Sequence, residues 1–289
     1  MKRTPGMVIF DGINQIVITV ITLLSLYPMF HVLVASFSEP IRIMNHQGPL
    51  LWPLGFSLEG YRIVINNPSV MTGYMNTIFY VIAGSAVNMV MTILGAYVLA
   101  QREFMPKKFC MVMIVFTMYF SGGIIPNFLL VRYLGMLNTR WALIIPTAIG
   151  TWNMLVLRTA FRVVPEALED AARIDGANDL TILVRIMIPV SKATIAVILL
   201  FYAVGHWNSW FNAMIYLPRA RNLYPLQLFL REILISSSIE VSGADSGIDF
   251  IGELIKYSTT IVSTVPILCL YPFLQRYFVK GIMMGSVKG

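Results

Sequence analysis

Aromatic and amide side chains gather in one apolar stretch of the sequence, between Gly205 and Tyr216. It contains no Asp, Glu, Lys or Arg, and it carries His206, Trp207, Asn208, Trp210, Asn212 and Tyr216. Aromatic rings pack on the apolar C–H faces of sugars while amides bond their hydroxyls. The stretch therefore predicts a path for a hydroxyl-rich ligand, with Asn208 and Asn212 on one helix face and Tyr216 one turn further. The alternative is an aromatic belt at a membrane interface.

Three asparagines in other apolar stretches are weaker candidates for the same path: Asn76, Asn88 and Asn153. His206 alone is more typical of a residue that bonds a neighbouring helix than of a proton carrier. Ion-coupled carriers commonly use intramembrane carboxylates, and intramembrane proteases need a nucleophile with its base or paired aspartates. Neither set is evident, and the two cysteines lie in separate apolar stretches. We therefore expect no catalytic residue and no metal site.

The stretch between Pro165 and Pro189 has the pattern of a short helix, a glycine and a second helix. Pro165 suits a first helical position, and acidic residues follow near the positive end of the helix dipole: Glu166, Glu169 and Asp170. One face of this helix carries small and medium apolar side chains: Ala167, Leu168, Ala171, Ala172 and Ile174. Gly176, which follows Asp175, can end the helix because glycine readily adopts a positive φ.

The second helix of this stretch can be capped by Asn178. Apolar residues recur along it at helical spacing until Pro189: Ile182, Leu183, Ile186 and Met187. Because alanines line the first helix, the backbone of another protein could approach it closely. The pattern therefore predicts a contact with a partner protein, and the alternative is a helix that lies on lipid headgroups.

The elements that must position both stretches are predicted to be membrane-spanning helices. The sequence is 57% hydrophobic and 12% charged, far more apolar than a soluble domain. A spanning helix needs about 20 mostly apolar residues, and six stretches qualify: 12–37, 71–100, 109–131, 141–157, 193–217 and 257–275. The stretch 141–157 is the shortest and contains Pro146 and Gly150. We therefore expect a single all-α integral membrane domain over residues 1–289.

The basic residues set the expected orientation of these spans. Lys2, Arg3 and most other Lys and Arg residues fall on one side of the six spans, which is the cytoplasmic side under the positive-inside rule. Both termini, the loop 158–192 and the tail 276–289 are then cytoplasmic. The net charge of +7 is explained by this topology and does not indicate a nucleic-acid partner. The uncharged outer segment 43–58 is broken by Pro and Gly, so we expect it to be interfacial or re-entrant.

The cytoplasmic loop resembles a known motif at the residues that define its two helices. Asp170-Ala171-Ala172, Gly176, Ile186 and Ile188-Pro189 resemble the EAA loop of ABC importer permeases. Asp170 stands where that motif usually has Glu, and Ile188 where it usually has Leu, so charge and apolar character are kept. The resemblance covers most of the chain and is closest to the second permease of maltose-like carbohydrate importers. It implies a type I ABC importer permease fold with a cytoplasmic EAA coupling helix.

The resemblance also implies how the chain is assembled with its partners. Residues 166–176 would be a coupling helix that docks on an ATPase subunit. The end of the tail would reach between two such subunits: Gly285, Ser286, Val287, Lys288 and Gly289. The other implied partners are a homologous second permease, an extracytoplasmic solute-binding protein and an oligosaccharide substrate. The implied place is the lipid bilayer of a bacterial cytoplasmic (inner) membrane.

ATP binding is expected to belong to the partners rather than to this chain. A P-loop needs a Gly-Lys pair before Ser or Thr, and none of the 20 glycines is followed by lysine. We therefore expect no cofactor in this chain, with ATP and Mg²⁺ held by the ATPase subunits, and no enzymatic activity of its own. The alternative function is an ATP-independent secondary carrier or channel for a small polar solute.

Overall fold

The computed structural model describes residues 5–240 and 255–269, and every regular element in these two ranges is a helix. The chain divides into two compact units, which are described separately. The first unit comprises Met1–Val70 and Leu230–Val265, and the second comprises Met71–Phe229 and Pro266–Gly289. The sequence predicted an all-α chain, and the described ranges confirm it. The tail residues 285–289 lie outside the described residues.

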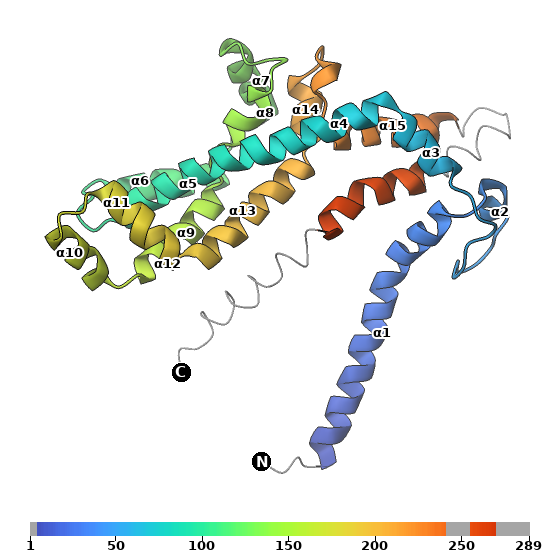
Figure 1. Ribbon diagram of the computed structural model, residues 1–289, viewed down its shortest axis with the longest axis horizontal. Coiled ribbons are helices and arrows are strands. Elements are labelled where there is room, and N and C mark those ends of the chain that lie inside the picture. The colour runs from blue at the N-terminus through green and yellow to red at the C-terminus, as the bar shows by residue number, and fades with distance from the viewer. Residues whose placement is uncertain (1–4, 241–254, 270–289) are drawn as a thin grey trace. The chain divides into compact units, whose positions relative to one another are not determined.

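The first unit is built around the end of a long apolar helix, α1 (Pro5–Ser36), in blue in Figure 1. The short helices α2 (Pro40–Met44) and α3 (Glu59–Asn66) follow it. Val34, Ala35 and Leu50 are buried together. The Tyr27 hydroxyl accepts a hydrogen bond from the Leu50 N–H at 3.0 Å. This anchors the irregular part of segment 43–58 to α1, and the position of that segment in a membrane stays a prediction.

The second unit contains the elements that carry both candidate sites. α4 (Pro68–Phe79), the π-helical turn η1 (Tyr80–Gly84) and α5 (Ser85–Ala100) form one continuous helix. The following elements are α6 (Lys107–Tyr119), α7 (Ile124–Tyr133), α8 (Trp141–Ile144), η2 (Ile145–Thr147), α9 (Thr151–Val163), α10 (Glu166–Ile174), α11 (Asp179–Ile182), η3 (Leu183–Met187), α12 (Ile188–Val190), α13 (Lys192–Trp207), α14 (Phe211–Tyr216) and η4 (Arg221–Leu223). The last helix, α15 (Leu226–Glu240), begins here and continues into the first unit. α5, α9 and α13 pack on one another (Figure 1).

Two helices are long and apolar enough to cross a membrane unbroken, Ile9–Ser36 and Pro68–Ala100. Two further predicted spans, 109–131 and 141–157, are bent helix pairs in the described part of the chain: α6 and α7 meet at 115°, and α8–η2 and α9 at 49°. A third bent pair, α11–α12 and α13, meets at 86° and joins the predicted loop 158–192 to the predicted span 193–217. The sixth, 257–275, is helical over 257–269, and its remainder lies outside the described residues. The multi-span architecture is confirmed, but most spans are broken rather than straight.

One break has a local cause, and three expected boundaries differ in the structure. Residues 109–131 were expected to be one span, but Ser121-Gly122-Gly123 interrupts the helix, with Gly123 at φ 83°. α9 extends to Val163, beyond the end at 157 expected for the span. The stretch 193–217 is interrupted between Trp207 and Phe211.

Two clusters of buried apolar residues hold the second unit together. The first joins α5, α9, the α11–η3 segment and α13, and its members include Leu157, Ile182 and Ile198, all fully buried. The second joins η1, α7, α8 and α14 through residues such as Tyr80 and Ile144. Helices within a bilayer associate mainly through such close packing. The α11–η3 segment therefore shares a core with the spanning helices.

Candidate functional site: a candidate coupling segment and a cavity beside α13

Residues 165–189, which we call the coupling segment, form the helix, turn and second helix expected from the sequence. Pro165 has φ −60° and ψ 130°, so it is the N-cap of α10 and not, as expected, its first helical residue. At the other end Gly176 adopts φ 81°. The Ala177 N–H donates to Ala172 O at 2.9 Å, and the Gly176 N–H donates to Arg173 O at 3.0 Å. This pair of bonds is a Schellman motif, which requires a residue in the left-handed region at Gly176.

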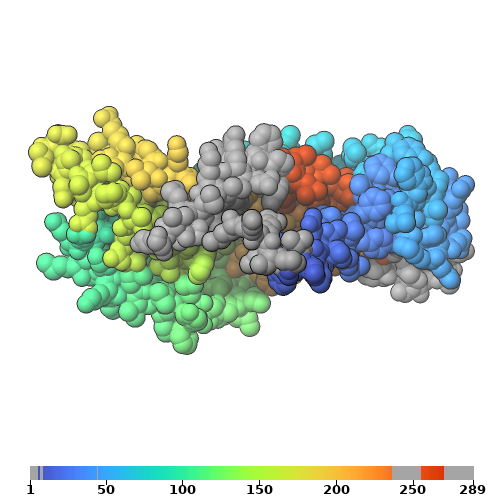
Figure 2. Space-filling view, turned by 90° about the horizontal axis from the view of Figure 1, so that it is seen from below, coloured from blue at the N-terminus to red at the C-terminus, as the bar shows by residue number. Residues whose placement is uncertain are grey.

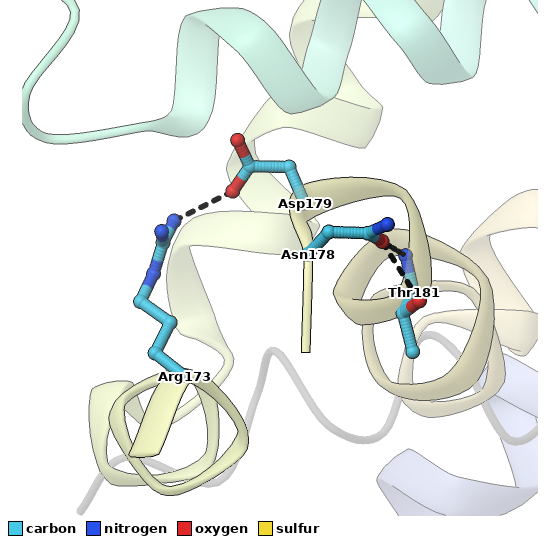
Figure 3. A network of polar contacts seen from close by, with 4 residues as sticks. All are labelled: Arg173, Asn178, Asp179 and Thr181. Carbon is cyan, nitrogen blue, oxygen red and sulfur yellow. Dashed lines mark hydrogen bonds and ion pairs between the residues drawn. The ribbon is translucent and has the colours of Figure 1, made fainter. Parts of the chain in front are cut away.

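The turn between α10 and α11 is held by the side chains shown in Figure 3. Asn178 Oδ1 accepts hydrogen bonds from the Thr181 N–H and hydroxyl, each at 2.8 Å, so Asn178 caps α11 as predicted. Arg173 Nη2 lies 2.8 Å from Asp179 Oδ1 and joins the last turn of α10 to the first turn of α11. Because both side chains are largely exposed, this ion pair contributes little to stability. It does link α10 to α11 across the glycine turn.

The apolar face predicted for α10 is divided between the core and solvent. Ala172 is half-buried and packs against the first core cluster, as does Ala177. The other apolar side chains of α10 are exposed, and Ile174 is 86% exposed. We call these four residues the coupling face: Ala167, Leu168, Ala171 and Ile174. In Figure 2 the yellow-green residues of this segment lie at one end of the second unit.

Two connections fix α10 to the rest of the second unit. The α11–η3 segment that follows its glycine turn is buried in the first core cluster through Ile182, Leu183 and Met187. Arg102, in the loop after α5, forms an ion pair with Glu166 at the start of α10. Ile186 is half-buried and Pro189 is exposed, two residues before the chain bends by 86° into α13. A displacement of α10 can therefore be passed to α5, α9 and α13 by direct packing.

Gly176→Ala is expected to destabilise the coupling segment by about 1–2 kcal/mol, because an L-residue in the left-handed region brings its Cβ too close to the following carbonyl oxygen. The change should lower the midpoint of thermal unfolding and speed amide exchange at Ala177. Gly205→Ala is the matched control, since Gly205 is helical with open space around it, so alanine there should be neutral or slightly stabilising. Equal midpoints for the two variants would contradict the strained turn.

A cavity of about 550 Å³ lies beside α8–η2, the start of α9 and the junction of α13 and α14. Four residues that the sequence singled out line it: His206, Asn208, Trp210 and Asn212. Asn88, the weaker candidate from α5, lines it as well. Among its described lining residues there is no carboxylate, ammonium or guanidinium group. The lining is a mixture of ring faces, amides and hydroxyls.

The helix that carries most of these residues breaks inside the group. Asn208 is the C-cap of α13, and its side-chain Nδ2 donates to Val204 O at 3.0 Å. α14 starts again at Phe211. The expectation that Asn208 and Asn212 lie one turn apart on one continuous helix is therefore wrong. They line the same cavity because the chain turns between the two helices.

Two aromatic residues expected on the path lie in packed positions instead. Trp207 is buried and meets the Tyr74 ring edge-on, with ring centroids 6.3 Å apart. Tyr216 is buried in the second core cluster. Neither is among the residues that line the cavity. Their positions favour a structural role, because apolar rings without access to the cavity stabilise the helix packing.

Two of the asparagines also lie outside the lining. Asn76 Nδ2 donates to the carbonyl oxygens of Asn222 and Tyr224, at 2.7 and 3.1 Å. Its Oδ1 accepts from Arg140 Nη2 at 3.1 Å, so Asn76 fastens the chain around η4 to α4. Asn153 is half-buried on α9, close to Gly150 but not on the cavity wall.

Several lining residues were not singled out as path residues by the sequence, among them Tyr202, Thr147 and Gly150. Tyr202 lies one turn before His206 on α13 and faces α5, which no local pattern indicates. A partial signal for the others was present, since Pro146 and Gly150 made 141–157 irregular as a span. The break that they cause forms part of the cavity wall.

Comparison with known proteins agrees with this architecture. Residues 92–215 match the sequence family described as binding-protein-dependent transport system inner membrane component. The chain is 39% identical, over 97% of its length and 99% of the relative's, to the polygalacturonan/rhamnogalacturonan transport system permease protein YtcP of Bacillus subtilis (strain 168). It is 34% identical to protein LplC of the same strain, over 100% of this chain and 98% of the relative.

A solved structure has the same fold. It is a chain of a bacterial ABC transporter involved in the import of the acidic polysaccharide alginate. The TM-score is 0.88 at 31% sequence identity, and the match covers 96% of this chain and 99% of the other. The fold is thus that of an ABC importer permease, as the sequence predicted. The chain belongs to the family of binding-protein-dependent transport system inner membrane components.

Proposed function

We propose that this chain is one of two homologous permease subunits of an ATP-driven importer, and that oligosaccharides cross the membrane through the cavity beside α13 and α14. The observation that carries the proposal is the cavity lining. Trp210 and Phe211 offer ring faces, and Asn212 and Ser209 offer groups that can hydrogen-bond hydroxyls. The uncharged lining suits the hydroxyls of a sugar. The names of the relatives refer to polygalacturonan, rhamnogalacturonan and alginate, and so support a saccharide substrate. Because alginate is an acidic polysaccharide, the carboxylates of such a substrate would have to be bound by groups outside this uncharged lining.

The coupling face of α10 supports docking to an ATPase. It presents small and apolar side chains on a helix whose opposite side packs on the chain's own core. Exposed apolar patches rimmed by polar residues are typical of protein contacts. Asp170, in the middle of α10, and Asp175, its C-cap, are both exposed and would supply that rim. Two ATP-binding cassette subunits would hold the ATP and Mg²⁺, and one would receive this face.

The packing suggests how ATP could drive transport. Movement of the docked ATPase would displace α10, and Arg173–Asp179 with the Schellman turn would carry α11 along. Because Ile182 and Met187 lie in one core with α5, α9 and α13, these helices would tilt together. Such a rigid-body displacement would open the cavity to one side of the membrane and then the other. The binding protein would deliver the oligosaccharide on the outer side, with both termini of this chain in the cytoplasm of a bacterium.

The test is transport by the complex that co-purifies with the tagged chain, reconstituted in lipid vesicles with its binding protein. Labelled oligogalacturonides, alginate oligosaccharides and arabino-oligosaccharides would be offered in parallel. We expect uptake of at least one series to require ATP, and the loaded binding protein to stimulate ATP hydrolysis. Absence of an accompanying ATPase, or uptake that ignores ATP, would favour the ATP-independent carrier. The family's description as binding-protein-dependent already counts against that alternative.

A further inference from the structure

The break between η2 and α9 places polar backbone groups inside a predicted span. The helical pattern stops at Thr147 and resumes at Thr151, so carbonyl and amide groups on either side lack their usual helical partners. Irregular backbone at membrane depth is tolerated only where protein groups or a water-filled cavity satisfy it. The side chains that hydrogen-bond the backbone groups of this break therefore show what holds it in place.

Asn88 provides the first partner. Its Nδ2 donates to Thr147 O at 2.5 Å, and its Oδ1 lies 2.6 Å from His206 Nε2. A carbonyl oxygen can only accept, so the amide nitrogen of Asn88 must face Thr147, and Oδ1 must face the histidine. His206 therefore carries its proton on Nε2 and donates it to Asn88. Asn88 is 1% exposed, so its amide is shielded from bulk solvent.

Tyr202 provides the second partner. Its hydroxyl accepts the Gly150 N–H at 2.9 Å and lies 2.7 Å from Thr92 Oγ1. Thr92 is fully buried. The two arrangements have the same composition: a side chain of α5, a side chain of α13 and one backbone group of the break.

We call the two arrangements rungs: the first is Asn88, His206 and Thr147 O, and the second is Thr92, Tyr202 and the Gly150 N–H. Together they form one ladder of hydrogen bonds between α5 and α13. Asn88 and Thr92 are one turn apart on α5, and Tyr202 and His206 are one turn apart on α13. Glycines make room for both rungs. A Cβ on Gly84 would collide with the His206 ring, and a Cβ on Gly150 would lie 3.0 Å from the Tyr202 hydroxyl. The absence of a side chain at Gly84 and Gly150 thus lets the His206 and Tyr202 side chains of α13 come close enough for the hydrogen bonds to form.

We propose that Asn88 and Tyr202 are positioning residues that lock the η2–α9 break in place as one wall of the cavity, and thereby set which oligosaccharides pass. Asn88 Nδ2 bonds Thr147 O, and the Tyr202 hydroxyl bonds the Gly150 N–H, so both side chains bind the chain's own backbone. They would affect the ligand indirectly, by fixing the position of residues 147–150. This inference rests on the proposed function for its effect on selectivity. The ladder itself can be tested without any substrate.

The central variant is Tyr202→Phe, which removes one hydroxyl and keeps the ring. Tyr80→Phe is the matched control, because the Tyr80 hydroxyl also bonds a backbone group, donating to Leu223 O at 2.8 Å, away from the cavity. Asn88→Leu removes the other rung at similar volume. The reporter is the Gly150 N–H, which donates to the Tyr202 hydroxyl at 2.9 Å. Its rate of hydrogen–deuterium exchange measures opening of the break.

Without substrate, we expect Tyr202→Phe to speed deuterium labelling of the Gly150 N–H by about two- to tenfold, the factor that one lost net hydrogen bond represents. Tyr80→Phe should leave the rate unchanged while lowering thermal stability by a similar amount. Equal labelling of native, Tyr202→Phe and Tyr80→Phe proteins would overturn the ladder. An equal acceleration in both variants would overturn it too, since general loosening would then explain the result.

Uptake then tests selectivity in the reconstituted complex. The probes are the two- and four-residue members of the oligosaccharide series that the native complex carries best in the screen above. We expect Tyr202→Phe and Asn88→Leu to change the ratio of their initial uptake rates by a similar two- to tenfold factor, and Tyr80→Phe to keep it. Rates that fall together at a constant ratio would overturn the positioning role. Failure of the native complex to take up any series would instead reject the proposed function and leave the labelling result standing.

Discussion

The Ala171→Arg variant is expected to lose its ATPase subunits during purification and to abolish ATP-driven uptake. Ala171 lies in the middle of the coupling face and is exposed, whereas its neighbour Ala172 packs against the core. A long charged side chain there would prevent close approach and would bury an unpaired charge in the contact. Central interface positions commonly cost 2 kcal/mol or more when disrupted, which is a roughly 30-fold loss of affinity. Co-purification of the ATPases on the tagged chain measures the effect directly.

The matched control places the same side chain elsewhere on the side expected to be cytoplasmic. Met105, in the loop after α5, is 96% exposed and lies outside the coupling face, so Met105→Arg should retain the ATPases. Folding of both variants can be compared by their thermal unfolding midpoints, which should match because neither site is buried. Retention of the ATPases by Ala171→Arg at an unchanged midpoint would sink the docking assignment.

Position 171 is preferable to position 172 for this test, and only the structure shows why. From the sequence alone both alanines had the same status, because each lies on the apolar side of a short amphipathic helix. In the fold, Ala172 packs against the chain's own core and Ala171 does not. A bulky residue at 172 would disturb internal packing and detach the ATPase indirectly. The orientation of a short helix depends on tertiary contacts that its own periodicity does not contain.

The coupling segment was otherwise predictable in detail because its determinants are local. A capping asparagine, a glycine at positive φ and acidic residues in the first turn act within a few residues of sequence. Gly176 and Asn178 accordingly have the conformations that their types predict. The long span 71–100 was predictable for a similar reason, since its apolar run is uninterrupted and forms an unbroken helix.

The broken spans and the cavity were only partly predictable, because they depend on contacts between distant segments. Hydropathy alone does not distinguish a straight span from two helices joined at 115°. Asn88 and Tyr202 are 114 positions apart in numbering, yet they act on the same backbone break. An asparagine in an apolar run indicates that a polar partner exists, but it does not indicate which one. For that reason Asn76 and Asn88 had equal status in the sequence and different roles in the fold.

Trp210→Ala is expected to lower oligosaccharide uptake by about tenfold while the complex remains assembled. Trp210 lines the cavity and is only half-buried against the second core cluster, so its removal takes away ring surface from the ligand path. About 1.4 kcal/mol of lost contact corresponds to this factor. Trp152→Ala is the control, because Trp152 is 64% exposed on α9 and is not among the lining residues. Its uptake should equal that of the native complex.

Asn212→Ala extends the same argument from the ring to the polar part of the lining. Asn212 is half-buried at the first turn of α14 and lines the cavity, so losing its amide should lower uptake by about two- to tenfold, the value of one net hydrogen bond. ATPase stimulation by the loaded binding protein should persist in both variants, since neither residue contacts the coupling segment. Native uptake by both would move the substrate path away from this cavity. A joint loss of uptake and of ATPase co-purification would indicate a folding defect and make Trp210 and Asn212 structural residues.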